Sequence, residues 1–183
     1  MSKISIYLLT LYDDINIMII TGDNMKDFRK IILRLIEMNK TIATMESCTG
    51  GGVADAITSI ERASEVLRFS AVTYSNEYKI KMGVDKNIID KYSVYSKETA
   101  RDMALNIAKF ANSDIGIGIT GKLNRADINN NFGKDNEVFV AIYYNNIYYD
   151  IDLVVDKESR KLNKLVVIDK IIEKLEDILW EEK

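Results

Sequence analysis

Apolar positions recur along the chain with two different periods, and these periods outline the predicted elements. Spacings of three and four residues predict amphipathic helices over 28–36, 52–60, 96–108 and 158–180. Alternating or continuous β-branched runs predict strands over 41–45, 69–74, 114–120, 138–144 and 147–153. Asn145-Asn146, between the last two strands, predicts a two-residue hairpin turn.

The order of these elements predicts an α/β fold, a single-domain three-layer sandwich with a mixed β-sheet and helices on both faces. We assign 1–25 to an N-terminal extension, made of two short strands or a docking segment, and 26–183 to the domain itself. The apolar run 4–12 is too short to span a bilayer, and no small-residue cleavage site follows it. We therefore expect no membrane association and a cytoplasmic location. The polar, Asn-rich stretch 122–136 predicts an exposed loop.

The composition excludes several classes of function. A net charge of −3 over 183 residues disfavours nucleic-acid binding, which needs a clustered excess of Lys and Arg. The most basic stretch, 157–164, is interleaved with apolar residues and fits a solvated helix face. One cysteine and no histidine exclude an intrachain disulfide and the common transition-metal sites, so we expect neither a metal nor a cofactor.

The absence of histidine also restricts catalysis. Ser-His-Asp and Cys-His arrangements are excluded, so any hydrolase chemistry must use Lys, Tyr or a carboxylate as the general base. Burial or neighbouring charges would have to tune the pKa of such a group.

The stretch ESCTGGG, 46–52, lies between a predicted strand and a predicted helix. Glycines let a backbone approach a ligand closely, and a helix N-terminus offers N–H donors to a phosphate or an oxyanion. The stretch matches neither the P-loop nor the G-x-S-x-G pattern. These residues alone leave two interpretations open: a ligand-binding turn, or a plain helix start.

The longer sequence narrows this choice. The segments ATMESCTGGGVADAI, FSAVTYSNEYKIKMGV, VYSKETARDMA and IGIGITG follow one another in the chain. Together they resemble the C-terminal domain of the competence/damage-inducible CinA family, over roughly residues 27–180. Active members are nicotinamide mononucleotide (NMN) deamidases. The resemblance does not extend to the molybdopterin-binding-like N-terminal part of longer members.

The resemblance implies a catalytic trio. Ser47 of ESCTGG corresponds to the nucleophile, Lys79 of YSNEYK to its general base, and Tyr74 to a third catalytic member. The implied reaction is amide hydrolysis of NMN to nicotinic acid mononucleotide and ammonia, a step of pyridine nucleotide salvage. The family also implies a homodimer, for which the helix over 158–180 offers a surface.

The resemblance further implies a substrate-binding set. The backbone N–H groups of Cys48, Thr49 and Gly50 are candidates for the oxyanion hole. Thr120 and Gly121 would line the substrate site, and Arg160 would contact a phosphate.

Each assignment competes with a purely structural role. Glu46 either orients Lys79 or anchors the turn, and the sequence does not decide between the two. The competing structural roles are a helix N-cap for Ser47, a surface position for Lys79, a half-buried core aromatic for Tyr74, a buried structural thiol for Cys48, a satisfied strand end for Thr120 and an exposed helix position for Arg160.

The chain departs from the family after ITG. Members usually continue with A-G-P, a glycine-rich loop and K-P-V-G, whereas this chain reads KLNRADINNNFGKDNEV. The replaced segment, 121–137, leaves two further possibilities: a CinA-like protein with an altered substrate, or a non-catalytic module that binds a nucleotide or a partner.

Overall fold

The computed structural model describes residues 26–124 and 133–181, so the predictions made for 1–25 lie outside the described residues. The helices are α2 (Arg29–Glu37), α3 (Gly52–Thr58), α4 (Asn76–Lys81), α5 (Lys86–Tyr92), α6 (Lys97–Ala111) and α7 (Arg160–Glu181), with a 3₁₀ turn η1 (Ala63–Glu65). The strands are β1 (Ile42–Glu46), β2 (Leu67–Val72), β3 (Ile115–Gly121), β4 (Glu137–Tyr144) and β5 (Ile147–Val154).

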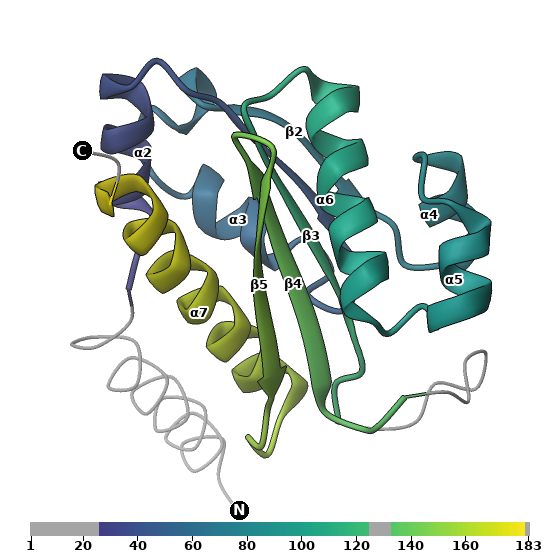
Figure 1. Cartoon of the computed structure of the whole chain (residues 1–183). Coiled ribbons are helices and arrows are strands. Elements are labelled where there is room, and N and C mark those ends of the chain that lie inside the picture. Colours follow the sequence, from purple (N-terminus) through teal and green to yellow (C-terminus); the bar gives the residue numbers. More distant parts are fainter. Residues whose placement is uncertain (1–25, 125–132, 182–183) are drawn as a thin grey trace, which may run out of the picture.

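The strands form one mixed sheet in the order β2-β1-β3-β4-β5. β1 pairs in parallel with β2 and β3, whereas β3–β4 and β4–β5 are antiparallel. Helices cover both faces, with α2, α3 and α7 on one side and α6, α4 and α5 on the other (Figure 1). This arrangement confirms the predicted α/β sandwich, and Asn145-Asn146 forms the predicted hairpin turn.

The alternation along β3 explains how α6 packs so closely. Ile115, Ile117 and Ile119 join the core beneath α2, α3 and α7. Gly116 and Gly118 face α6, and a Cβ at Gly118 would lie 2.1 Å from the carbonyl oxygen of Ala100. The backbone approach predicted for these glycines is therefore confirmed, because only a missing side chain permits it.

The predicted helix behind Ser96 is also confirmed, whereas two short helices escaped prediction. The Ser96 hydroxyl caps α6 by accepting the N–H of Thr99 at 3.1 Å. α4 and α5 are short segments without an apolar stripe, and local caps stabilise them instead. Ser75 accepts the N–H of Tyr78, and Asp85 accepts the N–H of Asn87.

The predicted exposed loop over 122–136 requires a correction at its start. Lys122 and Leu123 are buried, because the Lys122 backbone pairs with the carbonyl of Glu137 at 2.9 Å and Leu123 enters the core. The chain thus stays paired with the start of β4 for one residue after β3 ends, and Leu123 then packs into the core. Residues 125–132 lie outside the described part of the chain.

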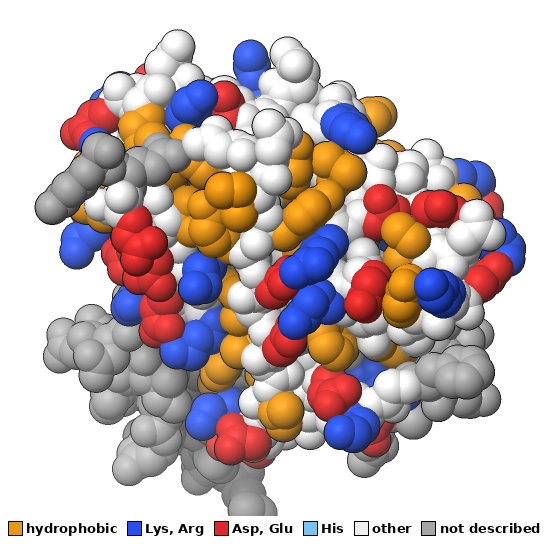
Figure 2. Space-filling model, in the orientation of Figure 1, with side chains coloured by type: hydrophobic (Ala, Val, Ile, Leu, Met, Phe, Trp, Pro, Cys, Tyr) orange, Lys and Arg blue, Asp and Glu red, His pale blue; other side chains and the backbone are white. Residues whose placement is uncertain are grey.

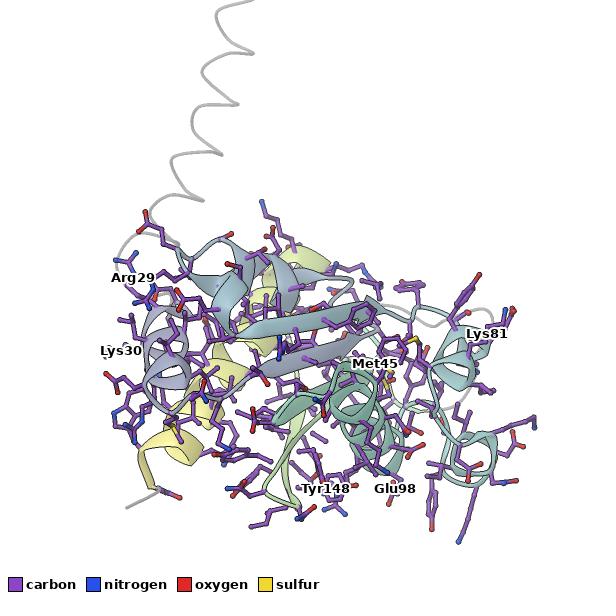
Figure 3. All side chains as sticks on the ribbon, turned by 90° about the horizontal axis from the view of Figure 1, so that it is seen from above. Arg29, Lys30, Met45, Lys81, Glu98 and Tyr148 are labelled. Carbon is purple, nitrogen blue, oxygen red and sulfur yellow. The ribbon has the colours of Figure 1, made fainter. Side chains whose placement is uncertain are left out.

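The surface mixes charges of both signs (Figure 2). Lys97 pairs with Asp152 at 2.9 Å, and Arg101 pairs with Asp150, so ion pairs cover the face of the edge strand β5 beside α6. Across residues 26–124 and 133–181, no helix combines the length and apolar character that a membrane span requires. Seen from above, Arg29 and Lys30 of α2 lie at the opposite end of the molecule from Lys81 of α4 (Figure 3).

Candidate active site

The parallel strands β1, β2 and β3 end at the same edge of the sheet, and the candidate site is built from the segments that follow them. The first is the glycine turn, residues 47–51, between β1 and α3. Gly50 and Gly51 adopt φ of +62° and +93°, a region that residues with a side chain rarely enter. Ser47 opens this turn, and its N–H donates to the carbonyl of Ile119 at 3.0 Å, which ties the turn to β3.

The Glu46 side chain anchors the glycine turn. Its carboxylate is fully buried and accepts the backbone N–H groups of Gly51, Val53 and Ala54 at 3.1, 3.1 and 2.9 Å. Of the two roles left open for Glu46, these hydrogen bonds establish the anchor. The N–H donors that a helix start at α3 would offer to a ligand are already occupied by this side chain.

Ser47 and Lys79 meet in the interior. The Lys79 ammonium is 1% exposed and donates to Ser47 Oγ at 3.1 Å and to the carbonyl of Thr73 at 2.8 Å. This contact lies within the reach of about 2.6–3.2 Å that proton transfer requires. The prediction that the two side chains lie within hydrogen-bond reach is confirmed, and the surface position considered for Lys79 is wrong.

The helix α4 positions Lys79 although it is only six residues long. The N–H of Thr73 donates to the carbonyl of Glu46 at 2.8 Å, so the chain after β2 stays beside β1. Ser75 then caps α4. Because Lys79 is the buried residue of this helix, its side chain returns toward the end of β1 and reaches Ser47.

Cys48 is a buried thiol rather than a nucleophile. Burial raises its pKa to about 12, although its own backbone N–H and the charges of Lys79 and Arg160 work in the opposite direction. A thiol with this pKa stays protonated at neutral pH and reacts poorly.

The backbone N–H groups of the glycine turn differ in whether they are free to bind an oxyanion. The N–H of Gly50 donates to the carbonyl of Ser47 at 3.1 Å, so its proposed place in an oxyanion hole is taken. Within the described ranges, the N–H groups of Cys48 and Thr49 have no acceptor in another residue. The candidate oxyanion hole is therefore narrowed to these two donors.

Tyr74 lies on the surface, in contact with Arg160. It follows β2 by two residues and is 67% exposed, so the half-buried core position considered for Tyr74 is wrong. Its hydroxyl accepts a hydrogen bond from Arg160 at 3.4 Å, and Arg160 also donates to the carbonyl of Leu123 at 2.6 Å. Tyr74 is thus coupled to Arg160, the predicted phosphate contact.

Thr120 and Gly121 end β3 beside the glycine turn, since Ser47 pairs with the preceding residue, Ile119. The Thr120 hydroxyl is buried and donates to the carbonyl of Val94 at 2.8 Å. This bond gives Thr120 the structural role of a satisfied strand end. Gly121 is buried too, and its φ of +154° suits a glycine.

Two features of the site escaped sequence analysis. Lys164 of α7 reaches over the glycine turn, because a Cβ at Gly50 would lie 3.2 Å from its Nζ. The sequence feature that could have identified Lys164 is its spacing of four residues from Arg160, which places both side chains on one face of the helix. Asn163 is the second: its buried side chain bonds Asn124 at 2.8 Å and the N–H of Lys157 at 2.9 Å, which joins α7 to the segment after β3.

Comparison with known proteins identifies the family. The CinA C-terminal domain model matches residues 26–177. A competence-damage inducible protein of Clostridium beijerinckii is 46% identical over 107 residues, which cover 55% of this chain and 26% of that protein. One from Alkaliphilus metalliredigens is 36% identical over 135 residues, covering 72% of this chain and 32% of the relative. The chain thus spans about a quarter to a third of the length of these relatives.

Solved structures share the fold. A CinA superfamily protein from Escherichia coli matches with a TM-score of 0.75 at 22% identity, covering 81% of this chain and 86% of that one. A competence/damage-inducible protein from Agrobacterium tumefaciens matches with a TM-score of 0.73 at 25% identity, covering 80% and 89%. With the family model matching most of its length, the chain belongs to the CinA C-terminal domain family.

Proposed function

We propose that this domain is a nicotinamide-nucleotide amidase, which hydrolyses NMN to nicotinic acid mononucleotide and ammonia. The observation that carries the proposal is the buried 3.1 Å contact between Ser47 Oγ and Lys79 Nζ in a chain without histidine. A serine needs an adjacent base to act as a nucleophile, and Lys79 is the group placed to be that base.

The proposed mechanism starts from a neutral Lys79 amine. Burial away from water disfavours the charged form of a lysine, and Lys79 is 1% exposed. In the neutral state the Ser47 hydroxyl donates to the amine lone pair across the same contact. Ser47 Oγ then attacks the carboxamide carbon while its proton passes to Lys79.

The tetrahedral intermediate carries a negative oxygen, which the N–H groups of Cys48 and Thr49 stabilise in the proposal. The protonated Lys79, with help from the Tyr74 hydroxyl, returns a proton to the amide nitrogen, so that the C–N bond breaks and ammonia leaves. Water next attacks the acyl-enzyme, again with Lys79 as the base. This step releases the carboxylate and restores Ser47.

The segment after β3 supports a second candidate, an amidase for a different carboxamide. Lys122 and Leu123 replace the start of the family's A-G-P loop and are buried against β4 and the core. This change alters the wall of the site beside Thr120 while leaving Ser47 and Lys79 in contact. A panel of amides under the same assay distinguishes the two candidates, because an altered pocket would prefer another amide over NMN.

The proposal also covers partners and location. The reaction needs a small-molecule nucleotide and water, without a nucleic acid, a membrane or a further cofactor. Its substrate belongs to pyridine nucleotide salvage, so we place the protein in the cytoplasm. The family resemblance favours a homodimer, which light scattering coupled to size-exclusion chromatography can test on the full chain.

The decisive experiment measures ammonia release from NMN by the wild type and by Ser47→Ala, Lys79→Ala and Tyr74→Phe. We expect losses of at least ~10³-fold in kcat for the first two, because they remove the nucleophile and the base. Tyr74→Phe should lose about 100-fold, in the range of one general acid–base contribution. Lys81→Ala is the matched control, since Lys81 lies on the same helix but is exposed and paired with Glu77.

The ammonia assay tests the substrate and the mechanism separately. Absence of ammonia from NMN with the wild type would refute the proposed substrate. Activity that survives in both Ser47→Ala and Lys79→Ala would refute the mechanism. Far-UV circular dichroism of every variant separates lost chemistry from lost folding, which matters most for the buried Lys79.

A further inference from the structure

The first turns of α7 concentrate positive charge. Arg160, Lys161 and Lys164 lie there, and the first turn contains no acidic residue. A helix dipole disfavours cations at this end, and like charges four residues apart repel each other. In the part of the chain that the structure describes, neither Arg160 nor Lys164 forms an ion pair with a carboxylate. A bound anion would relieve this repulsion and complement the positive end of the helix dipole.

Both cationic groups face the candidate site. The half-buried Lys164 places Nζ 3.2 Å from the position that a Cβ of Gly50 would occupy. Arg160 lies one turn earlier on the same helix face, held by the carbonyl of Leu123 and the hydroxyl of Tyr74. The two groups thus lie over the glycine turn, between the segments that follow β1 and β3.

The glycine turn itself has little to offer a phosphate. Glu46 occupies the N–H groups of Gly51, Val53 and Ala54, and its own negative charge opposes a second anion at the start of α3. The N–H groups of Cys48 and Thr49 are assigned to the oxyanion in the proposed mechanism, so side chains are left to hold a phosphate at this edge of the sheet. The Asn163 side chain bonds Asn124 and accepts the N–H of Lys157. These bonds join the start of α7 to the segment after β3 and so help to fix the positions of Arg160 and Lys164.

We propose that Lys164 joins Arg160, the phosphate contact that the family resemblance implies, and that Lys164 determines the preference for a nucleotide over the unphosphorylated riboside. This inference rests on the proposed amidase function. The φ of +62° favours glycine at position 50, and the missing side chain leaves room for the Lys164 ammonium, whose Nζ would lie 3.2 Å from a Cβ there. Ser47 Oγ contacts Lys79 Nζ at 3.1 Å, so we assign proton transfer to Lys79 and phosphate binding to Lys164.

The kinetic test compares NMN with nicotinamide riboside, which carries the same amide without phosphate. Lys164→Gln should lower the ratio of kcat/KM for NMN over the riboside by about 10- to 100-fold, as expected for one lost charge-assisted hydrogen bond, mainly through KM. Lys164→Arg should retain most of the preference. Lys161→Gln is the control, because it removes the same charge from an exposed neighbouring position. An equal effect of Lys161→Gln and Lys164→Gln would overturn the inference.

A binding test works without catalysis. Inorganic phosphate at 50 mM, compared with chloride of equal ionic strength, should raise the Tm of the wild type and of Lys161→Gln by about 3 °C if phosphate binds with a Kd of a few millimolar. Lys164→Gln should lose this shift. Phosphate stabilisation that depends on Lys164, without ammonia release from NMN, would support the anion site while refuting the amidase. Equal stabilisation of all variants, or none in the wild type, would overturn the inference.

Discussion

Replacing Glu46 with glutamine removes the charge that holds the glycine turn while leaving the size of the side chain unchanged. In the wild type, one carboxylate oxygen accepts the N–H groups of Gly51 and Val53, and the other accepts the N–H of Ala54. A glutamine has one oxygen, so at least one of these donors must face the amide NH₂ group instead. The most favourable orientation keeps the bonds to Gly51 and Val53 and loses the one to Ala54.

The expected loss in the free energy of unfolding follows from this geometry. Losing one hydrogen bond to a charged acceptor removes about 1.5–3 kcal/mol, and the two remaining bonds weaken because their acceptor becomes neutral. Together these changes predict a loss of about 3 kcal/mol in the free energy of unfolding. For a domain of this size, that loss corresponds to a fall in Tm of roughly 6–12 °C.

Urea unfolding followed by far-UV circular dichroism measures this loss, and a lower midpoint with an unchanged slope identifies a change in stability. Glu65→Gln is the matched control, since Glu65 pairs with Arg62 on the surface, where water screens the pair, and should leave the midpoint nearly unchanged. Ammonia release should also fall in Glu46→Gln at temperatures where the variant is folded, because Ser47 adjoins the loosened anchor. A stability within about 0.5 kcal/mol of the wild type, on the scale of a surface change, would refute the anchoring role.

Two further predictions concern packing and pH. Gly118→Ala should destabilise the fold by about 3 kcal/mol or prevent folding, because the new methyl group would lie 2.1 Å from the Ala100 carbonyl oxygen. Thermal unfolding measures this loss, and a Tm equal to that of the wild type would contradict the packing of α6 against β3. Cys48, whose pKa burial raises to about 12, should resist Ellman's reagent at pH 8 until urea unfolds the chain. Because the unfolded thiol ionises near pH 8.5, stability should fall by about 1.4 kcal/mol per pH unit from there toward pH 12, relative to Cys48→Ala. Identical pH profiles for the two proteins would contradict the burial of this thiol.

Sequence periodicity was sufficient for the elements that have a strong apolar pattern. The helix behind Ser96 and the hairpin at Asn145-Asn146 follow from local spacing and local caps, which neighbouring residues determine. α4 and α5 lack such a stripe, so their existence depends on single capping side chains and was not predicted. Leu123 was assigned to a loop from the polar residues around it, although the sheet buries it.

The sequence by itself determined the α/β class, the exclusion of histidine chemistry and the residues from which an amidase site could be built. It could not determine where those residues lie relative to one another, because Ser47 and Lys79 are 32 positions apart and meet only when β1 and β2 pair in parallel. The same holds for Lys164, whose approach to Gly50 depends on the packing of α7 beside α3. Tertiary structure alone decided that Glu46 anchors the turn, because its three backbone donors form a site for a carboxylate only once β1 and α3 are joined by the folded turn.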